Sequence, residues 1–548
     1  MHFSYSKENL SGREARLQRL LEIIPGLTSW LILIGMILLS IFSPFTAAII
    51  TISFYLCWLL RLLYMTLFLV LSYFQLSIER KTDWMARVHG LDDIANYFKK
   101  LHHTHGLLTL KRRLSLWRHK HTLSKLLNSG QLPPASKDIY HVVIFPIVKE
   151  GAQIIGPAVR AISRQPFAPK QIIVLLALEE RAAENIQKDV YDTVEKYRPD
   201  FYDCFVVKHP SEIPGEARVK GANVTWAARR ATEYIKERNI PFENVIVSCF
   251  DADTVVSADY FPCLTYHFMI SPDRQRASFQ PIPVYHNNIW QVPGFARVIE
   301  AGSSFFQLVE ATNPKKLVTF SSHSMSFKAL VEVGYWPVDM ISDDSAIFWK
   351  CYIHYDGNYR VVPMYVTLSM DIVSSQGWWN TVKSVYKQKR RWAWGVENFP
   401  LVIRAFIQSE KIRFYDKLRH GLKLFEGHVS WATWGFLLSL IGWMPVLFAR
   451  REFASSVVYY NVPEIANTIF RLASLCLLTS IVLSLALLPR TRVRYSARKK
   501  TVHTLEWLLL PIILATLGTL PALDAQTRLM TGRYLEFWVT DKHRKTKA

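Results

Sequence analysis

The chain has few cysteines, and they are not arranged to pair or to bind a metal. Its 548 residues include six cysteines with no C-x-x-C spacing, and two of the six lie within long apolar runs. Disulfide frameworks and zinc sites both need clustered cysteines at short spacing. We therefore expect six reduced thiols, and the pattern argues against a disulfide-stapled fold and a cysteine zinc site.

Acidic residues are also scarce. The 44 Asp and Glu face 66 Lys and Arg, which gives a formal net charge of +22. Much of the excess lies in three blocks that flank apolar segments, at residues 111–121, 490–500 and 541–548. Basic residues in such positions indicate the cytoplasmic ends of membrane helices and contact with anionic lipid. This placement disfavours nucleic acid as the partner.

The N-terminus lacks the pattern of a cleaved signal peptide. Residues 1–20 are polar, and the apolar run that follows is too long for a signal-peptide core. We expect that run to remain as two membrane crossings, at residues 27–50 and 52–77. Both of its flanks are basic on balance, so the charge rule places its two ends, and the domain that follows, in the cytoplasm.

Further apolar runs follow the middle of the chain. Residues 428–449 and 466–488 are each long enough to cross a membrane. Residues 507–523 are also free of charge, but Pro511 and Pro521 interrupt them, and one crossing there would place the basic tail outside. We expect an interfacial or re-entrant helix at that point, about four crossings in all and both termini in the cytoplasm.

Short apolar runs alternate with helical stretches in the middle of the chain. The four runs are residues 141–148, 171–178, 204–207 and 244–250. Continuous apolar runs separated by helices are typical of parallel strands covered on both faces. The sequence therefore predicts a doubly wound α/β sheet, and ligands of such sheets bind beyond the carboxyl ends of the strands.

These patterns divide the chain into six parts. In order, they are residues 1–80 with a cytoplasmic segment and two crossings, 81–137 as a basic connector, 138–375 as the α/β domain, 376–425 with interfacial helices, 426–490 with two crossings, and 491–548 with a basic loop, an interfacial or re-entrant helix and a tail. The connector holds His102, His103 and His105, but a solvated basic face explains them better than a metal site.

Two carboxylates follow the fourth apolar run, in "CFDADTVVS". Alternate residues at a strand end point to the same side, so Asp251 and Asp253 can bind one divalent cation. An acidic turn is the simpler explanation for an isolated D-x-D, but this pair lies at the edge where an α/β sheet binds its ligand. A cation held there would keep coordination positions open for diphosphate oxygens.

A second acidic pair stands in "MISDDSAIFWK", just before a helical pattern. Either Asp343 or Asp344 can be a helix N-cap, and the other can act as a general base toward an attacking hydroxyl. Farther on, residues 384–395, "SVYKQKRRWAWG", interleave cations with tryptophans. Taken alone, this stretch would suit a nucleic acid, a small diphosphate or lipid headgroups.

The stretch contains Gln388, Arg391 and Trp392 in Q-x-x-R-W spacing, and the order of the three motifs resembles the inverting family 2 glycosyltransferases. Among these, the membrane-embedded cellulose and hyaluronan synthase group is the most similar, over about residues 140–395. The resemblance implies a GT-A-like mixed sheet in a cytoplasmic domain inserted between transmembrane helices. It also implies a divalent cation, Mg²⁺ or Mn²⁺, and a nucleotide-sugar donor.

The resemblance assigns a role to each motif. It gives metal binding to Asp251 and Asp253, catalysis as the base to Asp344, and substrate contacts to Asp343, Gln388, Arg391 and Trp392. An anchor at the membrane interface is the alternative explanation for the tryptophan.

Further positions are matched to the family's nucleotide-binding elements. Pro146 and Glu150, in "VVIFPIVKEG", would lie near the base. The next strand of the family ends in an Asp that holds uridine, whereas this chain has "LALEER", so Glu179 or Glu180 must serve.

Two shorter matches extend the resemblance. "VKGANVTWA" is similar to the K-x-x-x-L-N element, which implies that Lys220 and Asn223 contact the diphosphate and ribose, although a surface lysine is the alternative for the first. "FWVTDK" at 537–542 matches the F-x-V-T-x-K gating loop and implies substrate contacts by Thr540 and Lys542. Acceptor elements are less similar, with "TFSSHSMSF" at 319–327 in place of F-F-C-G-S, so the sequence names neither sugar nor acceptor.

The implied reaction is inverting transfer of a sugar from a nucleotide sugar, expected to be a UDP-sugar, to a glycan or lipid-linked hydroxyl. Processive polysaccharide synthesis is one form of it. Donor, acceptor and membrane lipids are the expected partners. A non-processive enzyme that adds one sugar to a lipid-linked acceptor is the first alternative, and an inactive membrane scaffold or transporter is the second. The intact charged residues of all three motifs argue against the second.

Overall fold

The sheet of the α/β domain has eight strands in the order β3-β2-β1-β4-β7-β6-β8-β5. The computed structural model of the chain describes residues 5–7, 10–102, 109–130, 132–167, 169–448, 455, 457–488, 497–536 and 538. The strands are β1 (Tyr140–Ile147), β2 (Ile172–Glu179), β3 (Asp203–His209), β4 (Val245–Cys249), β5 (Val255–Val256), β6 (Ala277–Val284), β7 (His323–Ser326) and β8 (Arg360–Ser369).

The first four strands are those predicted from the apolar runs, and they pair in parallel. The β7 strand is antiparallel to β4 and β6, while β6 runs parallel to β8. The predicted α/β class with a mixed sheet is therefore confirmed. Every residue of β2 and β4 is buried, which explains why these strands appear in the sequence as continuous apolar runs.

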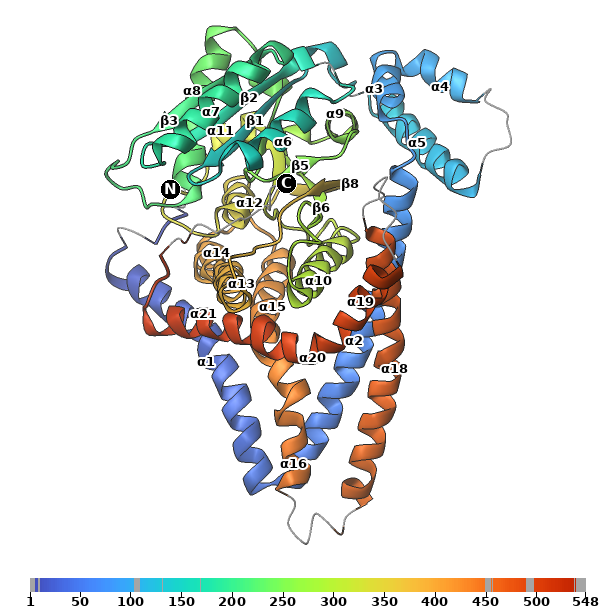
Figure 1. The fold of residues 1–548 in the computed structure, drawn as a ribbon, viewed down its shortest axis with the longest axis vertical. Helices are drawn as coiled ribbons and strands as arrows, with labels where there is room; N and C mark the ends of the chain where they lie inside the picture. The colour runs from blue at the N-terminus through green and yellow to red at the C-terminus, as the bar shows by residue number, and fades with distance from the viewer. Residues whose placement is uncertain are drawn as a thin grey trace.

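Helices cover both faces of the sheet (Figure 1). They are α6 (Ala152–Ser163), α7 (Glu184–Tyr197), α8 (Lys220–Glu237), α9 (Tyr260–Ile270), α10 (Gly294–Glu310), α11 (Phe327–Glu332) and α12 (Asp343–His354). Alternate residues of β1 enter two separate cores: Val143 and Phe145 pack with α6 and α9, and Val142 and Ile144 pack with α8 and α12. All six cysteines are free thiols, as expected, and five are buried.

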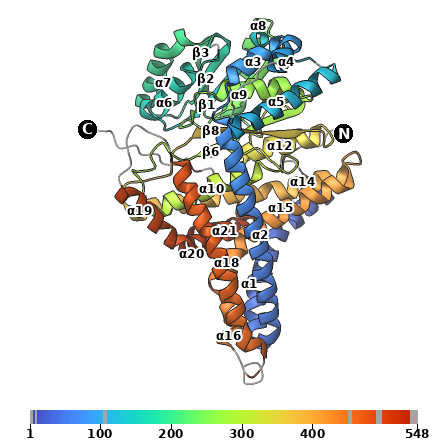
Figure 2. The ribbon, with the colours of Figure 1, turned by 90° about the vertical axis from the view of Figure 1, so that its right-hand side faces the viewer.

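Long helices extend below this domain (Figures 1 and 2). They are α1 (Gly12–Phe42), α2 (Pro44–Glu79), α15 (Phe414–Ser439) and α18 (Val457–Leu487), and the short helix α16 (Met444–Leu447) follows α15 in the chain. The break that the sequence suggests near Ser43 separates α1 from α2, and Pro44, which is favoured in the first turn of a helix, is the first residue of α2.

Within the described residues, four helices are long and apolar enough to cross a membrane, and a bent pair would make a fifth. The four are Gly12–Phe42, Pro44–Glu79, Tyr459–Leu487 and Thr504–Thr531, and the pair is Phe414–Ser439 with Ile441–Leu447, bent by 48°. The predicted crossing at 428–449 thus falls on the bent pair. The segment 507–523, predicted not to cross, lies in a helix that passes the same test.

The last helices take a different course from the others. They are α19 (Ala497–Glu506), α20 (Leu510–Ile513) and α21 (Leu520–Thr531), and both ribbon views show them between the α/β domain and the long helices, running across the bundle (Figures 1 and 2). A π-helical turn at Leu514–Thr519 joins α20 to α21, and the Trp431 indole donates a 3.0 Å hydrogen bond to the Gly518 carbonyl there. An interfacial position for 507–523 stays a prediction. A helix at the membrane interface would run across the bundle, as these helices do.

The predicted connector contains a three-helix unit. Its helices are α3 (Trp84–Asp92), α4 (Ile94–His102) and α5 (Leu110–Ser129). The unit is attached to α9 through His119, which is 2% exposed and bonded to the Tyr266 hydroxyl at 2.8 Å and the Tyr97 hydroxyl at 3.2 Å. His103 and His105 lie outside the described residues.

Candidate active site

A cavity of about 170 Å³ lies at the carboxyl ends of β1, β2 and β4. Residues from nine segments of the chain line it, including the first turns of α8 and α12 and the helix α13 (Trp378–Ala393). The predicted site residues in its wall are Pro146, Glu150, Glu179, Lys220, Asp251, Asp253, Asp343, Asp344, Gln388, Arg391 and Trp392. The three motifs therefore meet at the edge of the sheet where a ligand was expected.

The D-x-D carboxylates are held by loops from the other half of the sheet. Asp251 Oδ2 accepts a 2.9 Å hydrogen bond from the hydroxyl of Ser321, a residue at φ 46° in the turn before β7. Asp253 is 1% exposed, and its Oδ2 accepts from the backbone N–H of Asp371 at 2.8 Å. Both side chains are thus oriented before any ligand binds.

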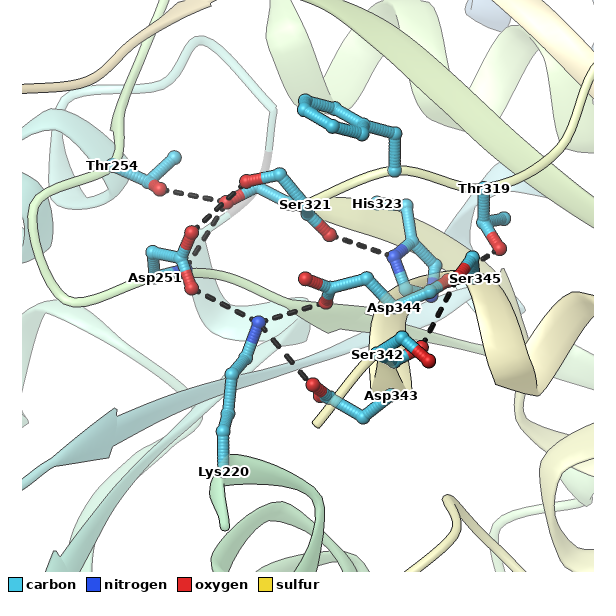
Figure 3. Close-up of polar contacts among 12 residues, drawn as sticks. Lys220, Asp251, Thr254, Thr319, Ser321, His323, Ser342, Asp343, Asp344 and Ser345 are labelled. Atoms are coloured by element: carbon cyan, nitrogen blue, oxygen red, sulfur yellow. Dashed lines mark hydrogen bonds and ion pairs between the residues drawn. The ribbon is translucent and has the colours of Figure 1, made fainter. Parts of the chain in front are cut away.

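Lys220, the first residue of α8, joins the two acidic motifs (Figure 3). Its Nζ lies 2.9 Å from Asp251 Oδ1, 2.8 Å from Asp344 Oδ1 and 3.9 Å from Asp343 Oδ2. Burial alone would lower the pKa of Lys220, but the surrounding carboxylates outweigh it and raise the pKa well above its usual range. The site therefore contains a permanent cation between the D-x-D and the second acidic pair.

Gly221, the residue after Lys220, explains how the start of α8 comes so close to the segment that leads to α12. A Cβ on Gly221 would lie 2.2 Å from the carbonyl oxygen of Pro337, in the segment that leads to α12. Only glycine allows this approach. The close contact brings the start of α8 against the start of α12, and with it Lys220 against the acidic pair.

The acidic pair occupies the first turn of α12, where the helix dipole favours negative charge. The expectation that one aspartate is the N-cap is wrong, because Ser342 holds that position and the aspartates are the first two helical residues. Asp343 has a 3% exposed side chain, and burial together with its neighbour's charge raises its pKa above the ordinary value. Asp344 is the more accessible of the two, at 27%.

The Q-x-x-R-W spacing places its three residues on one face of α13, because residues three and four apart share a helix face. Trp392 packs edge-on to Phe320, with ring centroids 5.6 Å apart, and lies 6.2 Å from Tyr285. These aromatic rings line one side of the cavity.

The neighbours of the motif do not line the cavity. Lys389 is 4% exposed, pairs with Glu300 of α10 at 3.0 Å, and lies 3.7 Å from the centre of the Trp392 ring. Arg390 pairs with Asp524 of α21 at 2.8 Å. The basic residues of this stretch thus divide into one that faces the cavity, Arg391, and others that hold α13 in place.

Some predicted site residues lie elsewhere. Asn223 is 1% exposed and donates to the Ala177 carbonyl at 2.8 Å, so it joins α8 to β2 instead of reaching a ribose. Of the two alternatives after β2, Glu179 faces the cavity, whereas Glu180 points away and accepts from the Ser211 N–H at 3.1 Å. Thr540 and Lys542 lie outside the described residues.

The cavity also has residues that the sequence argument missed. Asp371 follows the carboxyl end of β8, so the strand-end rule that identified Asp251 could have found it once β8 was recognised. Tyr285 follows β6 in the same way. His323 is fully buried, with Nδ1 2.9 Å from the Ser321 carbonyl, and it is a structural polar residue outside the cavity wall.

The donor set fits a divalent cation shared with a substrate. Among the described residues, no group of three His, Cys, Asp or Glu is arranged to hold a metal. Asp251 and Asp253 are two hard oxygen donors on one wall of the cavity. Mg²⁺ commonly binds through one or two carboxylates and completes its coordination with substrate phosphates and water. The pair suits that arrangement and not a metal enclosed by protein alone.

Residues 246–518 match the family model described as "Glycosyl transferase family group 2". The chain belongs to glycosyltransferase family 2. This confirms the resemblance drawn from the three motifs.

The glycosyltransferase is similar to the poly-beta-1,6-N-acetyl-D-glucosamine synthase of Staphylococcus aureus (strain COL), at 27% identity over 199 residues, 35% of this chain and 44% of the relative. It is 25% identical to the enzyme of that name from Staphylococcus epidermidis over 280 residues, 50% of this chain and 57% of the relative. The chain spans about half the length of the curated relatives it matches.

Solved glycosyltransferase structures match at low identity. The mannosyltransferase PcManGT from Pyrobaculum calidifontis, in complex with GDP-Man and Mn²⁺, has a TM-score of 0.37 at 14% identity and covers 78% of this chain and 98% of its own. S. aureus TarS 1–349 in complex with UDP-GlcNAc has a TM-score of 0.29 at 13% identity, with coverage of 61% and 91%.

Proposed function

We propose that the glycosyltransferase moves a sugar from a nucleotide sugar to an acceptor hydroxyl, with inversion, at the cytoplasmic face of a membrane. One observation carries the proposal. Lys220 binds Asp251 of the D-x-D and Asp344 of the second acidic pair at 2.9 and 2.8 Å, in a cavity that Arg391 and Trp392 also line. The groups needed for a leaving diphosphate, a base and a sugar ring therefore share one space.

The D-x-D side of the cavity is where the donor diphosphate would bind. Asp251 and Asp253 would hold Mg²⁺ or Mn²⁺, which would supply positive charge to the diphosphate as it leaves. Lys220 and Arg391 add fixed cationic groups to the lining of the cavity. Preorganised positive charge of this kind stabilises charge that develops in the transition state. Glu179, Glu150 and Pro146 lie toward the end of the cavity that would receive the nucleotide base.

The second acidic pair would act on the acceptor. Asp344 would take the proton from the acceptor hydroxyl as that oxygen attacks the anomeric carbon from the side opposite the diphosphate, and this direction of attack gives inversion. Trp392, with Phe320 and Tyr285 beside it, offers flat apolar faces for a sugar ring. Asp343, more buried, would hydrogen-bond the substrate.

Processive polysaccharide synthesis from a UDP-sugar is the form of the reaction that we favour. The relatives that match are named as synthases of a polymer. The long apolar helices joined to the catalytic domain suit an enzyme that works at a membrane. Addition of a single sugar to a lipid-linked acceptor would use the same catalytic groups, and product length separates the two.

Turnover of purified protein tests the proposal. The release of nucleoside diphosphate from UDP-GlcNAc, UDP-glucose and GDP-mannose is measured with Mg²⁺, with Mn²⁺ and with EDTA, and products are sized. We expect turnover with at least one donor, its loss in EDTA, and a fall of about 10²-fold or more in Asp344→Asn, since positioned bases contribute 10²–10⁴-fold. Failure with every donor would support the inactive-scaffold alternative, whereas wild-type rates in Asp344→Asn would refute the assignment of Asp344 as the base.

A further inference from the structure

Two residues at the end of the turn that follows α13, Glu397 and Asn398, bind the segment that carries the proposed base. A 3₁₀ turn, η6 (Trp394–Glu397), continues from α13 and leads into α14 (Asn398–Gln408). Glu397 and Asn398 are 5% and 1% exposed. Both lie behind the cavity wall and make their hydrogen bonds to the residues on either side of the acidic pair.

Glu397 is surrounded by hydrogen-bond donors. Its Oε1 accepts from the backbone N–H groups of Ile341 and Ser342, at 3.2 and 3.0 Å, and from the Ser342 hydroxyl at 2.7 Å. Its Oε2 accepts from the Trp394 indole N–H at 2.9 Å. Because donors face both oxygens, a carboxylate satisfies every partner, whereas an amide would turn an N–H₂ group toward a donor.

Asn398 completes the attachment from the other side. Its Nδ2 donates to the hydroxyls of Ser342 and Ser345, at 3.0 and 3.1 Å, and to the Gly395 carbonyl at 3.0 Å. Its Oδ1 accepts from the Tyr5 hydroxyl at 2.7 Å. Ser342 and Ser345 stand immediately before and after the two aspartates, so the acidic pair is held at both of its ends.

The geometry points to Glu397 and Asn398 as positioning residues that fix the base Asp344 relative to Arg391 and Trp392. They join the first turn of α12 to the end of α13 through hydrogen bonds that avoid the cavity. A buried charge is expensive unless it is fully bonded, so a carboxylate at this junction must be satisfied by both segments. The catalytic consequence rests on the proposed function, and the attachment itself does not.

The attachment can be measured without any substrate. Glu397→Gln should speed hydrogen exchange of the backbone amides of Ile341 and Ser342, read in a peptide covering residues 339–346. The matched control is Glu506→Gln, which removes a carboxylate that is also buried and is bonded to Arg297 at 2.9 Å, at the contact of α19 with α10. Exchange in 339–346 should be unchanged in this control.

Activity gives the second readout. In Glu397→Gln we expect kcat to fall at least about tenfold, because a displacement of 1 Å at a reacting group can cost about 10²-fold. Binding of UDP and GDP, measured by calorimetry, and the KM for the donor should stay within about twofold, since the D-x-D is untouched. A general loss of folding in Glu397→Gln would change kcat, KM and nucleotide binding together and would lower its melting temperature.

A double variant tests whether the hydrogen-bond donors around Glu397 cause the faster exchange and the lower kcat. Trp394→Phe removes the N–H that faces Oε2, so in Trp394→Phe/Glu397→Gln the amide can turn its oxygen toward Ser342. This variant should regain part of the lost exchange protection and part of kcat.

Asn398→Asp is a second, independent variant. Aspartate has a similar shape but cannot donate the hydrogen bonds of the amide, so kcat should fall, and this variant replaces Glu397→Gln if that protein does not fold. Unchanged exchange and unchanged kcat in Glu397→Gln and Asn398→Asp would overturn the inference. Faster exchange in Glu397→Gln, together with a wild type that turns over no donor, would leave the attachment standing while the proposed function fails.

Discussion

Replacing Lys220 by methionine tests the electrostatic arrangement of the site most directly. The variant keeps much of the side-chain length and removes the one cation that lies 2.9 Å from Asp251 and 2.8 Å from Asp344. Removing one partner of a buried ion pair costs about 3–5 kcal/mol. The two carboxylates are 25% and 27% exposed, so we take the lower end, about 3 kcal/mol.

That loss has a measurable size. For a domain of 150–250 residues, 1 kcal/mol corresponds to roughly 2–4 °C, so the melting temperature of the α/β domain should fall by roughly 6–12 °C. Added Mn²⁺ should restore part of the loss, because a divalent cation can replace the missing positive charge between the carboxylates, and the gain should exceed that of the wild type. Turnover should fall about 10²–10³-fold, the usual cost of losing one preorganised charge or donor.

The control is a lysine in an exposed pair. Lys328 lies 2.9 Å from Glu243, and both side chains are more than a third exposed, so Lys328→Met should cost less than about 1 kcal/mol. The reasoning would be refuted if Lys220→Met melted and turned over like Lys328→Met, or if Mn²⁺ stabilised the two variants equally.

Two further predictions concern the folding of the α/β domain. Burial lowers the pKa of His141 to about 3 from 6.5, so the unfolded chain binds more protons and stability falls as the pH drops below 6.5. This residue should contribute about 2 kcal/mol to the difference in unfolding free energy between pH 7.5 and pH 5.0. His141→Gln should therefore show a smaller change of stability with pH than the wild type. An unchanged dependence on pH would mean that the histidine is charged in the folded state. Gly221→Ala would place a Cβ 2.2 Å from the Pro337 oxygen and should destabilise by about 1–3 kcal/mol and lower turnover by displacing Lys220. Gly156→Ala, with nothing within 4 Å, should be neutral or stabilising, and equal melting of the two alanine variants would contradict the packing argument.

The sequence predicted what depends on local patterns. The first four strands begin and end within about two residues of the apolar runs, because strands buried on both faces must be apolar throughout. The D-x-D, the second acidic pair and the Q-x-x-R-W could be placed in one cavity because strand ends and helix spacing fix the direction of their side chains.

Other features depend on contacts between distant segments. Lys220 was expected to meet a diphosphate, but its bonds to Asp251 and Asp344 depend on how α8 packs against α12. Asn223, three residues later, turns toward β2, and its sequence match could not show this. Glu397 lies outside the three motifs, and its role is visible only when Ser342, 55 residues away, is brought beside it.

The tie between Arg390 of α13 and Asp524 of α21 bears on how the enzyme can be studied in parts. The helix that carries Arg391 and Trp392 is held at two places. Glu397, in the turn after it, bonds the start of α12, and Arg390 bonds α21. A soluble fragment ending after the sheet would retain every carboxylate of the cavity and lose one entire wall. We expect such a fragment to bind a nucleotide without transferring a sugar, so the catalytic unit that we propose includes the helices between the sheet and the long apolar helices.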